Sequence, residues 1–172
     1  AILGNNILFN ENLIRDFIDD TQYDNIISKA ILNHNRLYIE EGLNERELLH
    51  AKIIRDADKT DNFRVKVEDD FENIIDNSSK DILENDTISE NIFNDFMNSK
   101  IIVREDRKTF MDFWVSYIAF IFDYNYKFGL EYIKEMDYIN AIVDRLDYKN
   151  IDTKQKMEKI RKHALEFIDN CI

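Results

Sequence analysis

The sequence contains no proline and only three glycines among its 172 residues. Parallel-sheet enzymes and β-sandwiches need turn residues in quantity, so this scarcity argues against both and favours helices. The single cysteine, Cys171, excludes an internal disulfide and is typical of a reducing compartment, so the expected location is cytoplasmic. No apolar run approaches the length of a membrane span and no signal peptide is visible, so no membrane partner is expected.

Signals for binding nucleotides and nucleic acids are also missing. No Gly-rich phosphate loop occurs, which argues against nucleotide binding of the P-loop or Rossmann kind. The net charge of −12 repels the backbone of nucleic acids. We therefore expect no nucleic-acid polymer as a partner, and a phosphate-bearing substrate would need a local cation.

What the chain does have is a helix-forming apolar pattern. Hydrophobic residues make up 44% and aromatic residues 12%, enough for one ordinary domain with a sizeable core. We expect an all-α bundle in which residues 1–172 form a single domain, with a weak boundary in the polar stretch around 76–88. The expected helices cover residues 1–9, 12–19, 23–35, 45–67, 69–76, 80–84, a segment from 87 or 89 onward, 108–123, 128–146 and 153–168. The chain starts without methionine inside an apolar helical pattern, which indicates truncation at the N-terminus.

The expected helix 45–67 carries a carboxylate in its apolar face. At about 100° per residue, one stripe forms into which Asp56 projects. Its other members are Leu49, Ile53, Ala57, Thr60, Phe63 and Val67. An ionised carboxylate buried alone costs several kcal/mol or more, so Asp56 must be neutral, paired or bound to a metal.

His34 occupies the same kind of position on the expected helix 23–35. It continues the stripe formed by Ile26, Ile27, Ala30 and Ile31. A core histidine bonded to a backbone carbonyl explains such a residue without any function. An imidazole and a carboxylate on neighbouring apolar stripes also form half of a common divalent-metal site.

Two segments together resemble the later part of an HD-domain phosphohydrolase. They are Ala30-Ile-Leu-Asn-His-Asn35 and His50-Ala-Lys-Ile-Ile-Arg-Asp-Ala-Asp-Lys-Thr-Asp61. The resemblance implies an HD-domain-like helical bundle with one or two divalent metal ions, of which Mn, Mg, Fe and Ni are candidates. It makes Asp56 the late metal ligand and His34 a second ligand or phosphate contact, and it implies hydrolysis of a small phosphomonoester or phosphodiester, such as a nucleotide, by a metal-activated water. A homodimer is compatible with it.

The resemblance is incomplete at one point. The family's first His and its His-Asp pair precede the region that begins here at Ala1, and neither motif occurs in this sequence. Two ligands out of a set of about four to six bind a divalent ion weakly. The chain as it stands is therefore expected to be inactive if those ligands are absent from the protein.

The other candidate residues surround Asp56 in sequence. Lys59 and Arg64 are candidate phosphate contacts, although basic residues on an acidic helix are usually solvated or paired at i,i+4. His50 is a third candidate ligand. Three further residues are candidates for supporting roles around the metal: Lys52, Asp58 and Asp61.

The sequence leaves two other hypotheses open. The acidic surface and the missing ligands favour a non-catalytic helical regulatory or interaction module with a degenerate metal site. The other hypothesis is a helical bundle without a functional site, in which Asp56 pairs with Lys52 four residues earlier. Clustered aromatic residues around Trp114 have helical spacing and few basic neighbours, so we expect them to pack in the core rather than to stack on bases.

Overall fold

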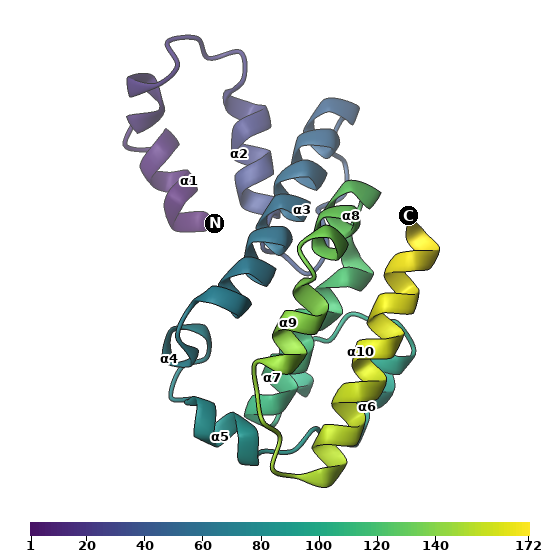
Figure 1. The fold of residues 1–172 in the computed structure, drawn as a ribbon. Coiled ribbons are helices and arrows are strands. Elements are labelled where there is room, and N and C mark those ends of the chain that lie inside the picture. Colours follow the sequence, from purple (N-terminus) through teal and green to yellow (C-terminus); the bar gives the residue numbers. More distant parts are fainter. The chain divides into compact units, whose positions relative to one another are not determined.

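The structure is a computed structural model that describes residues 1–172, and all its regular elements are helical: ten α-helices and three 3-10 helices (Figure 1). This confirms the predicted all-α class. Residues 1–58 and 59–172 form two compact units, and the division falls inside the long helix α3 (Glu45–Glu68). The boundary suggested around 76–88 lies within the second unit, and a single domain spanning both units stays a prediction. No helix is both long enough and apolar enough to span a membrane.

The first unit contains α1 (Ile2–Phe9), the 3-10 turn η1 (Leu13–Asp16), α2 (Asp24–Asn33) and the first part of α3. Helices α1 and α2 lie side by side (Figure 1), and the Ser28 hydroxyl on α2 donates to Asn5 Oδ1 on α1 at 2.7 Å. The prediction of a helix over residues 12–19 was wrong. Asn12 has a left-handed φ of 62°, and only the short turn η1 follows it. Asn tolerates that conformation, which a continuous helix does not contain.

Helix α3 begins where the sequence predicts, at a capping box. The Asn44 side-chain oxygen accepts from the backbone N–H groups of Arg46 and Glu47, both at 3.0 Å. The Glu47 carboxylate in turn accepts from the Asn44 N–H at 2.9 Å, so the two residues satisfy each other's terminal donors. Asn25 on α2 donates to the other oxygen of Glu47, which fastens the start of α3 to α2.

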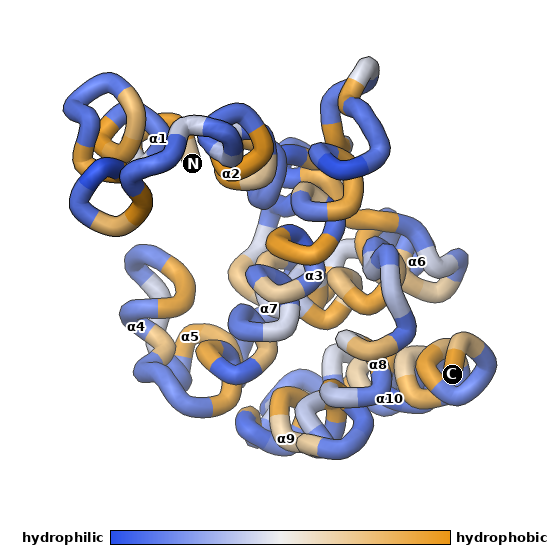
Figure 2. The backbone as a smooth tube through the Cα atoms, turned by 90° about the horizontal axis from the view of Figure 1, so that it is seen from above, coloured by the Kyte–Doolittle hydropathy of each residue, from blue (hydrophilic) through white to orange (hydrophobic).

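The second unit holds the rest of α3 and the remaining elements: α4 (Phe71–Ile74), α5 (Lys80–Asn85), α6 (Glu90–Met97), η2 (Arg104–Asp106), α7 (Phe110–Ile118), η3 (Ala119–Asp123), α8 (Lys127–Glu135), α9 (Tyr138–Asp144) and α10 (Ile151–Cys171). Helix α10 contacts α6, α8 and α9, and Figure 1 shows it running alongside α9. In Figure 2, apolar and polar bands alternate along α9 and α10, as expected for helices with one buried face.

The core of the second unit includes Trp114, Ile118, Ile142 and Ile160, all with 0% exposed surface. Trp114 therefore lies in the core, and the other aromatic residues of α7 pack partly buried against it, as predicted. The helix predicted over 128–146 is instead two helices, because Asp137 between α8 and α9 has a left-handed φ of 54°. Asn140 donates to Asp137 Oδ1 at 2.6 Å, a local hydrogen bond of the kind that stabilises such breaks.

Candidate functional site

Asp56 lies on the buried side of α3 and is 7% exposed, so the burial predicted for it is confirmed. The stripe predicted around it is only partly correct. Phe63 is buried and Thr60 and Val67 are half-buried, whereas Leu49 and Ile53 are 45% and 44% exposed and Ala57 is also exposed. The buried residues of α3 are Glu47, Ala51, Arg55, Asp56, Lys59, Phe63 and Lys66.

The error has a physical reason. Long basic side chains bury their methylene stems while their charged ends reach polar partners. The buried face of a helix can therefore include lysine and arginine as well as apolar residues. Arg55, Lys59 and Lys66 behave in this way, since they are 4%, 6% and 4% exposed. Arg55 and Lys59 are four residues apart, and Lys59 and Lys66 are seven apart, so all three fall on one face of the helix. A count of apolar residues alone misses this signal.

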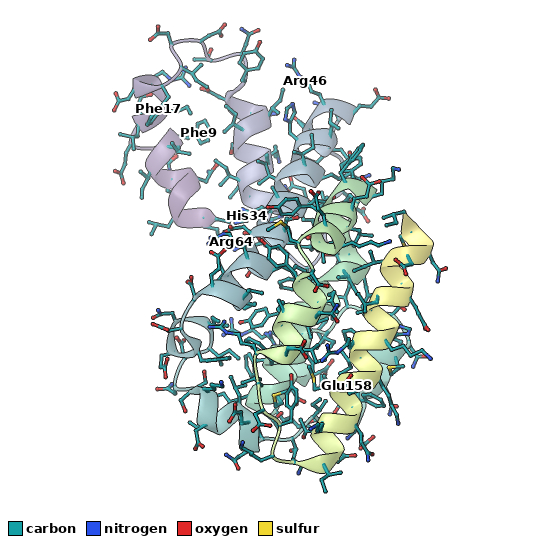
Figure 3. All side chains as sticks on the ribbon, in the orientation of Figure 1. Phe9, Phe17, His34, Arg46, Arg64 and Glu158 are labelled. Atoms are coloured by element: carbon teal, nitrogen blue, oxygen red, sulfur yellow. The ribbon has the colours of Figure 1, made fainter.

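His34 follows the last residue of α2 and is half-buried (labelled in Figure 3). Its Nδ1 lies 2.6 Å from the carbonyl oxygen of Ile31, one turn earlier. A carbonyl only accepts, so Nδ1 carries a proton and donates, and in the neutral imidazole Nε2 then keeps its lone pair. This hydrogen bond is the one expected for a core histidine, and it is also the arrangement that prepares Nε2 as a metal ligand.

Arg55, whose role no sequence pattern indicates, organises the turn after His34. Its guanidinium donates to the backbone carbonyls of Asn33 at 3.5 Å, of Arg36, and of Leu37 at 2.7 Å. One of these residues precedes His34 and the other two follow it closely. The side chain next to Asp56 therefore holds the backbone on either side of His34.

The same turn is closed from within. Asn33 is fully buried; its Nδ2 donates to the Lys29 carbonyl at 2.8 Å and its Oδ1 accepts from the Glu40 N–H at 2.9 Å. Glu40 forms ion pairs with Lys29 at 2.5 Å and Arg36 at 2.9 Å. The hydrogen bond and charge of Lys29, with the charge of Arg36, lower the pKa of Glu40 below 4.5. These contacts fix residues 33–40, which we call the His34 turn.

As metal donors, His34 and Asp56 are of the right chemical type. An imidazole nitrogen with a fixed tautomer and a buried carboxylate both suit a divalent transition ion. No group of three or more His, Cys, Asp or Glu side chains is arranged to hold a metal ion, however. These residues therefore fit part of a metal site and do not form a whole one.

In the second unit, α3 forms two polar pairs, one with the last residue of η3 and one with the first residue after it. Lys59 Nζ lies 2.9 Å from Asp123 Oδ2, and the Lys59 side chain is only 7% exposed. The hydroxyl groups of Thr60 and Tyr124 lie 2.9 Å apart. Consecutive residues on α3 thus pair with the consecutive residues Asp123 and Tyr124, which fixes the end of η3 against the helix.

Gly129 on α8 makes room for the Tyr124 ring. A Cβ atom at this position would lie 2.2 Å from Tyr124 Cε1 and 2.5 Å from Cδ1, closer than any real carbon contact. The lack of a side chain at Gly129 is therefore what allows the ring to reach Thr60. Here a glycine serves close packing, not a turn.

Arg64, the other candidate phosphate contact, lies on the surface of α3 (labelled in Figure 3). Its guanidinium pairs with Asp61 at 2.7 Å and with Glu68 at 2.6 Å, three and four residues away. The hydrogen bonds that Arg64 donates to these carboxylates raise the pKa of Arg64, and the one to Asp61 lowers the pKa of Asp61. This is the surface pairing that the sequence offered as the alternative to a phosphate role for Arg64 and a supporting role for Asp61.

The remaining candidates are half-buried residues on the unit 1 part of α3: His50, Lys52 and Asp58. His163, the third histidine of the chain, lies on α10 in the second unit, where its Nε2 is 2.9 Å from the Ser99 hydroxyl and its ring packs near Phe96 and Phe122. It is thus half-buried among aromatic rings, and not solvent-facing as its basic sequence neighbours suggest.

Comparisons with known proteins add no relative: no family model, no curated protein and no solved structure matches this chain.

Proposed function

We propose that this chain is the later part of a metal-dependent phosphohydrolase of the HD-domain type, acting on a small phosphorylated substrate in a reducing, cytoplasmic compartment. The observation that supports the proposal is the presence of two metal-compatible donors in one compact unit. The buried carboxylate of Asp56 and the oriented imidazole of His34 belong to segments that Arg55 joins through the Asn33 carbonyl.

Asp56 and His34 Nε2 would hold the metal ion, together with ligands beyond the two that these residues supply. When bound, a divalent ion would polarise a phosphoryl oxygen and lower the pKa of a coordinated water. The chain's own residues would provide a fixed donor geometry. Arg55 is the nearest cation in sequence to Asp56, and its buried position contributes positive charge to a protein that is otherwise strongly acidic.

A second candidate function is a non-catalytic regulatory or interaction module that retains a degenerate metal site. The observation that favours it is the lack of any group of three or more metal-ligating side chains. Such a module would bind a divalent ion weakly and would turn over no phosphate ester.

The experiment is metal analysis of the purified protein combined with phosphatase assays. Bound Mn²⁺ is measured by titration calorimetry, and hydrolysis of p-nitrophenyl phosphate and bis-p-nitrophenyl phosphate is followed with and without Mn²⁺. Asp56→Ala is the test variant. Asp61→Ala is the matched control, because it removes an exposed carboxylate of the same helix that already pairs with Arg64.

The enzyme proposal expects Mn²⁺ binding and Mn²⁺-dependent hydrolysis that Asp56→Ala lowers together and that Asp61→Ala leaves unchanged. Weak Mn²⁺ binding that requires Asp56, without hydrolysis, supports the regulatory module instead. Equal Mn²⁺ binding by the wild type and Asp56→Ala contradicts both functions and favours a bundle without a site.

A further inference from the structure

The buried guanidinium of Arg55 donates several hydrogen bonds to one stretch of backbone. Moving a charged side chain out of water is costly, so its donors need acceptors. The acceptors of Arg55 include three backbone carbonyls, those of Asn33, Arg36 and Leu37. All three lie within three residues of His34.

These carbonyls belong to the end of α2 and the turn after it. The last four carbonyls of a helix lack partners within the helix, and a cation near them also interacts favourably with the helix dipole. At the end of α2 the Ile31 carbonyl accepts from His34 Nδ1, and the Asn33 carbonyl accepts from Arg55. The C-terminus of α2 is therefore closed by side chains, and His34 is one of them.

The two hydrogen bonds depend on each other through the backbone. Arg55 fixes the backbone on both sides of His34, while the imidazole can reach the Ile31 carbonyl only when that backbone keeps its helical φ of −63° at His34. Nε2 lies across the imidazole ring from Nδ1, so this hydrogen bond directs Nε2 away from α2.

We infer that Arg55 is a positioning residue that fixes the His34 turn and thereby holds the imidazole in its Nδ1–H form with Nε2 available as a ligand atom. The purpose of this arrangement, metal ligation, rests on the proposed function. The effect on the tautomer does not, so the two can be tested separately. Groups that orient metal-binding histidines typically change metal affinity by about 10- to 100-fold when mutated.

The test is nitrogen NMR of the protein with ¹⁵N-labelled histidine at pH 8, where long-range couplings separate the Nδ1–H from the Nε2–H tautomer. The chain has only three histidines, and His163 in the second unit serves as an internal check of folding. The variants are Arg55→Met, which removes the donors, and Arg55→Lys, which keeps the charge but cannot span three carbonyls. Arg15→Met is the matched control, since Arg15 is a partly buried arginine of the same unit that bonds Asp24 and the Asp19 carbonyl.

We expect wild-type His34 and Arg15→Met to show the Nδ1–H form. Both Arg55 variants should shift His34 toward a mixture of tautomers, with Arg55→Lys shifted less, and should weaken Mn²⁺ binding about 10- to 100-fold. If His34 keeps the Nδ1–H form in both Arg55 variants, the inference is overturned, whatever the metal does. If the tautomer shifts but the wild type binds no Mn²⁺, the positioning role stands and the proposed function fails.

Discussion

Replacing Gly129 with alanine tests the packing that holds the segment between η3 and α8. The added Cβ would lie 2.2 Å from Tyr124 Cε1, so the ring must move. Its movement breaks the 2.9 Å hydrogen bond to Thr60. Overpacking typically costs about 1–3 kcal/mol, and the lost hydrogen bond about 1 kcal/mol.

Helix propensity acts in the opposite direction, because alanine in a helix interior is favoured over glycine by about 1 kcal/mol. The net expectation for Gly129→Ala is therefore a loss of about 1–3 kcal/mol in the free energy of unfolding. At this chain length, 1 kcal/mol corresponds to about 2–4 °C in Tm.

Urea unfolding followed by tryptophan fluorescence is a suitable assay. Trp114 is the only tryptophan, it is fully buried, and it lies in the same unit as Gly129. Gly4→Ala in α1 is the control, because a Cβ there would meet nothing within 4 Å. Its free energy of unfolding, followed by circular dichroism, should rise by about 0.4–1 kcal/mol. A Gly129→Ala protein that is more stable than the wild type would refute the packing argument.

Three further outcomes follow from the structure. Asn44→Ala removes the oxygen that accepts from two N–H groups at the start of α3, and should lower the free energy of unfolding by about 1 kcal/mol; an unchanged urea midpoint would contradict this. Ile160→Ala should cost about 2–5 kcal/mol, because Ile160 is fully buried in α10, whereas Ile151→Ala, at a residue 75% exposed, should change stability by less than about 0.5 kcal/mol. The pKa of Glu40 is lowered in the folded state, so its ion pairs stabilise the His34 turn above its ordinary pKa of 4.5 and are lost as the pH falls through the lower folded value. Hydrogen-exchange protection of the Glu40 amide, corrected for intrinsic rates, should fall only in that acid range, and Glu40→Gln should abolish this pH dependence.

The helical class and the long helix α3 followed from the sequence because their signals are local. The scarcity of turn residues predicts the helical class, and the structure confirms it, with α3 beginning at Glu45 as predicted. The breaks at Asn12 and Asp137 were not foreseen. Each is a single polar residue in the left-handed conformation, and neither Asn nor Asp requires that conformation by its chemistry alone.

The buried position of Asp56 could also be predicted, since it follows from helical periodicity. The role of Arg55 could not, because its acceptors are backbone carbonyls about twenty residues away, and every residue type has such a carbonyl. Leu49 and Ile53 were predicted to lie on the buried face of α3, and both are exposed. Which face of a helix is buried depends on its neighbours, and long basic side chains can occupy that face.

The most direct test of the central claim is selective broadening of histidine NMR signals by Mn²⁺ added to the intact protein. Paramagnetic broadening falls steeply with distance, so it identifies which imidazole binds the ion. The proposed site predicts that the His34 signal broadens first and that Asp56→Ala removes the effect. Equal broadening of all histidines, or a His34 signal that is indifferent to Mn²⁺ in the wild type, would contradict a metal site at His34 and Asp56.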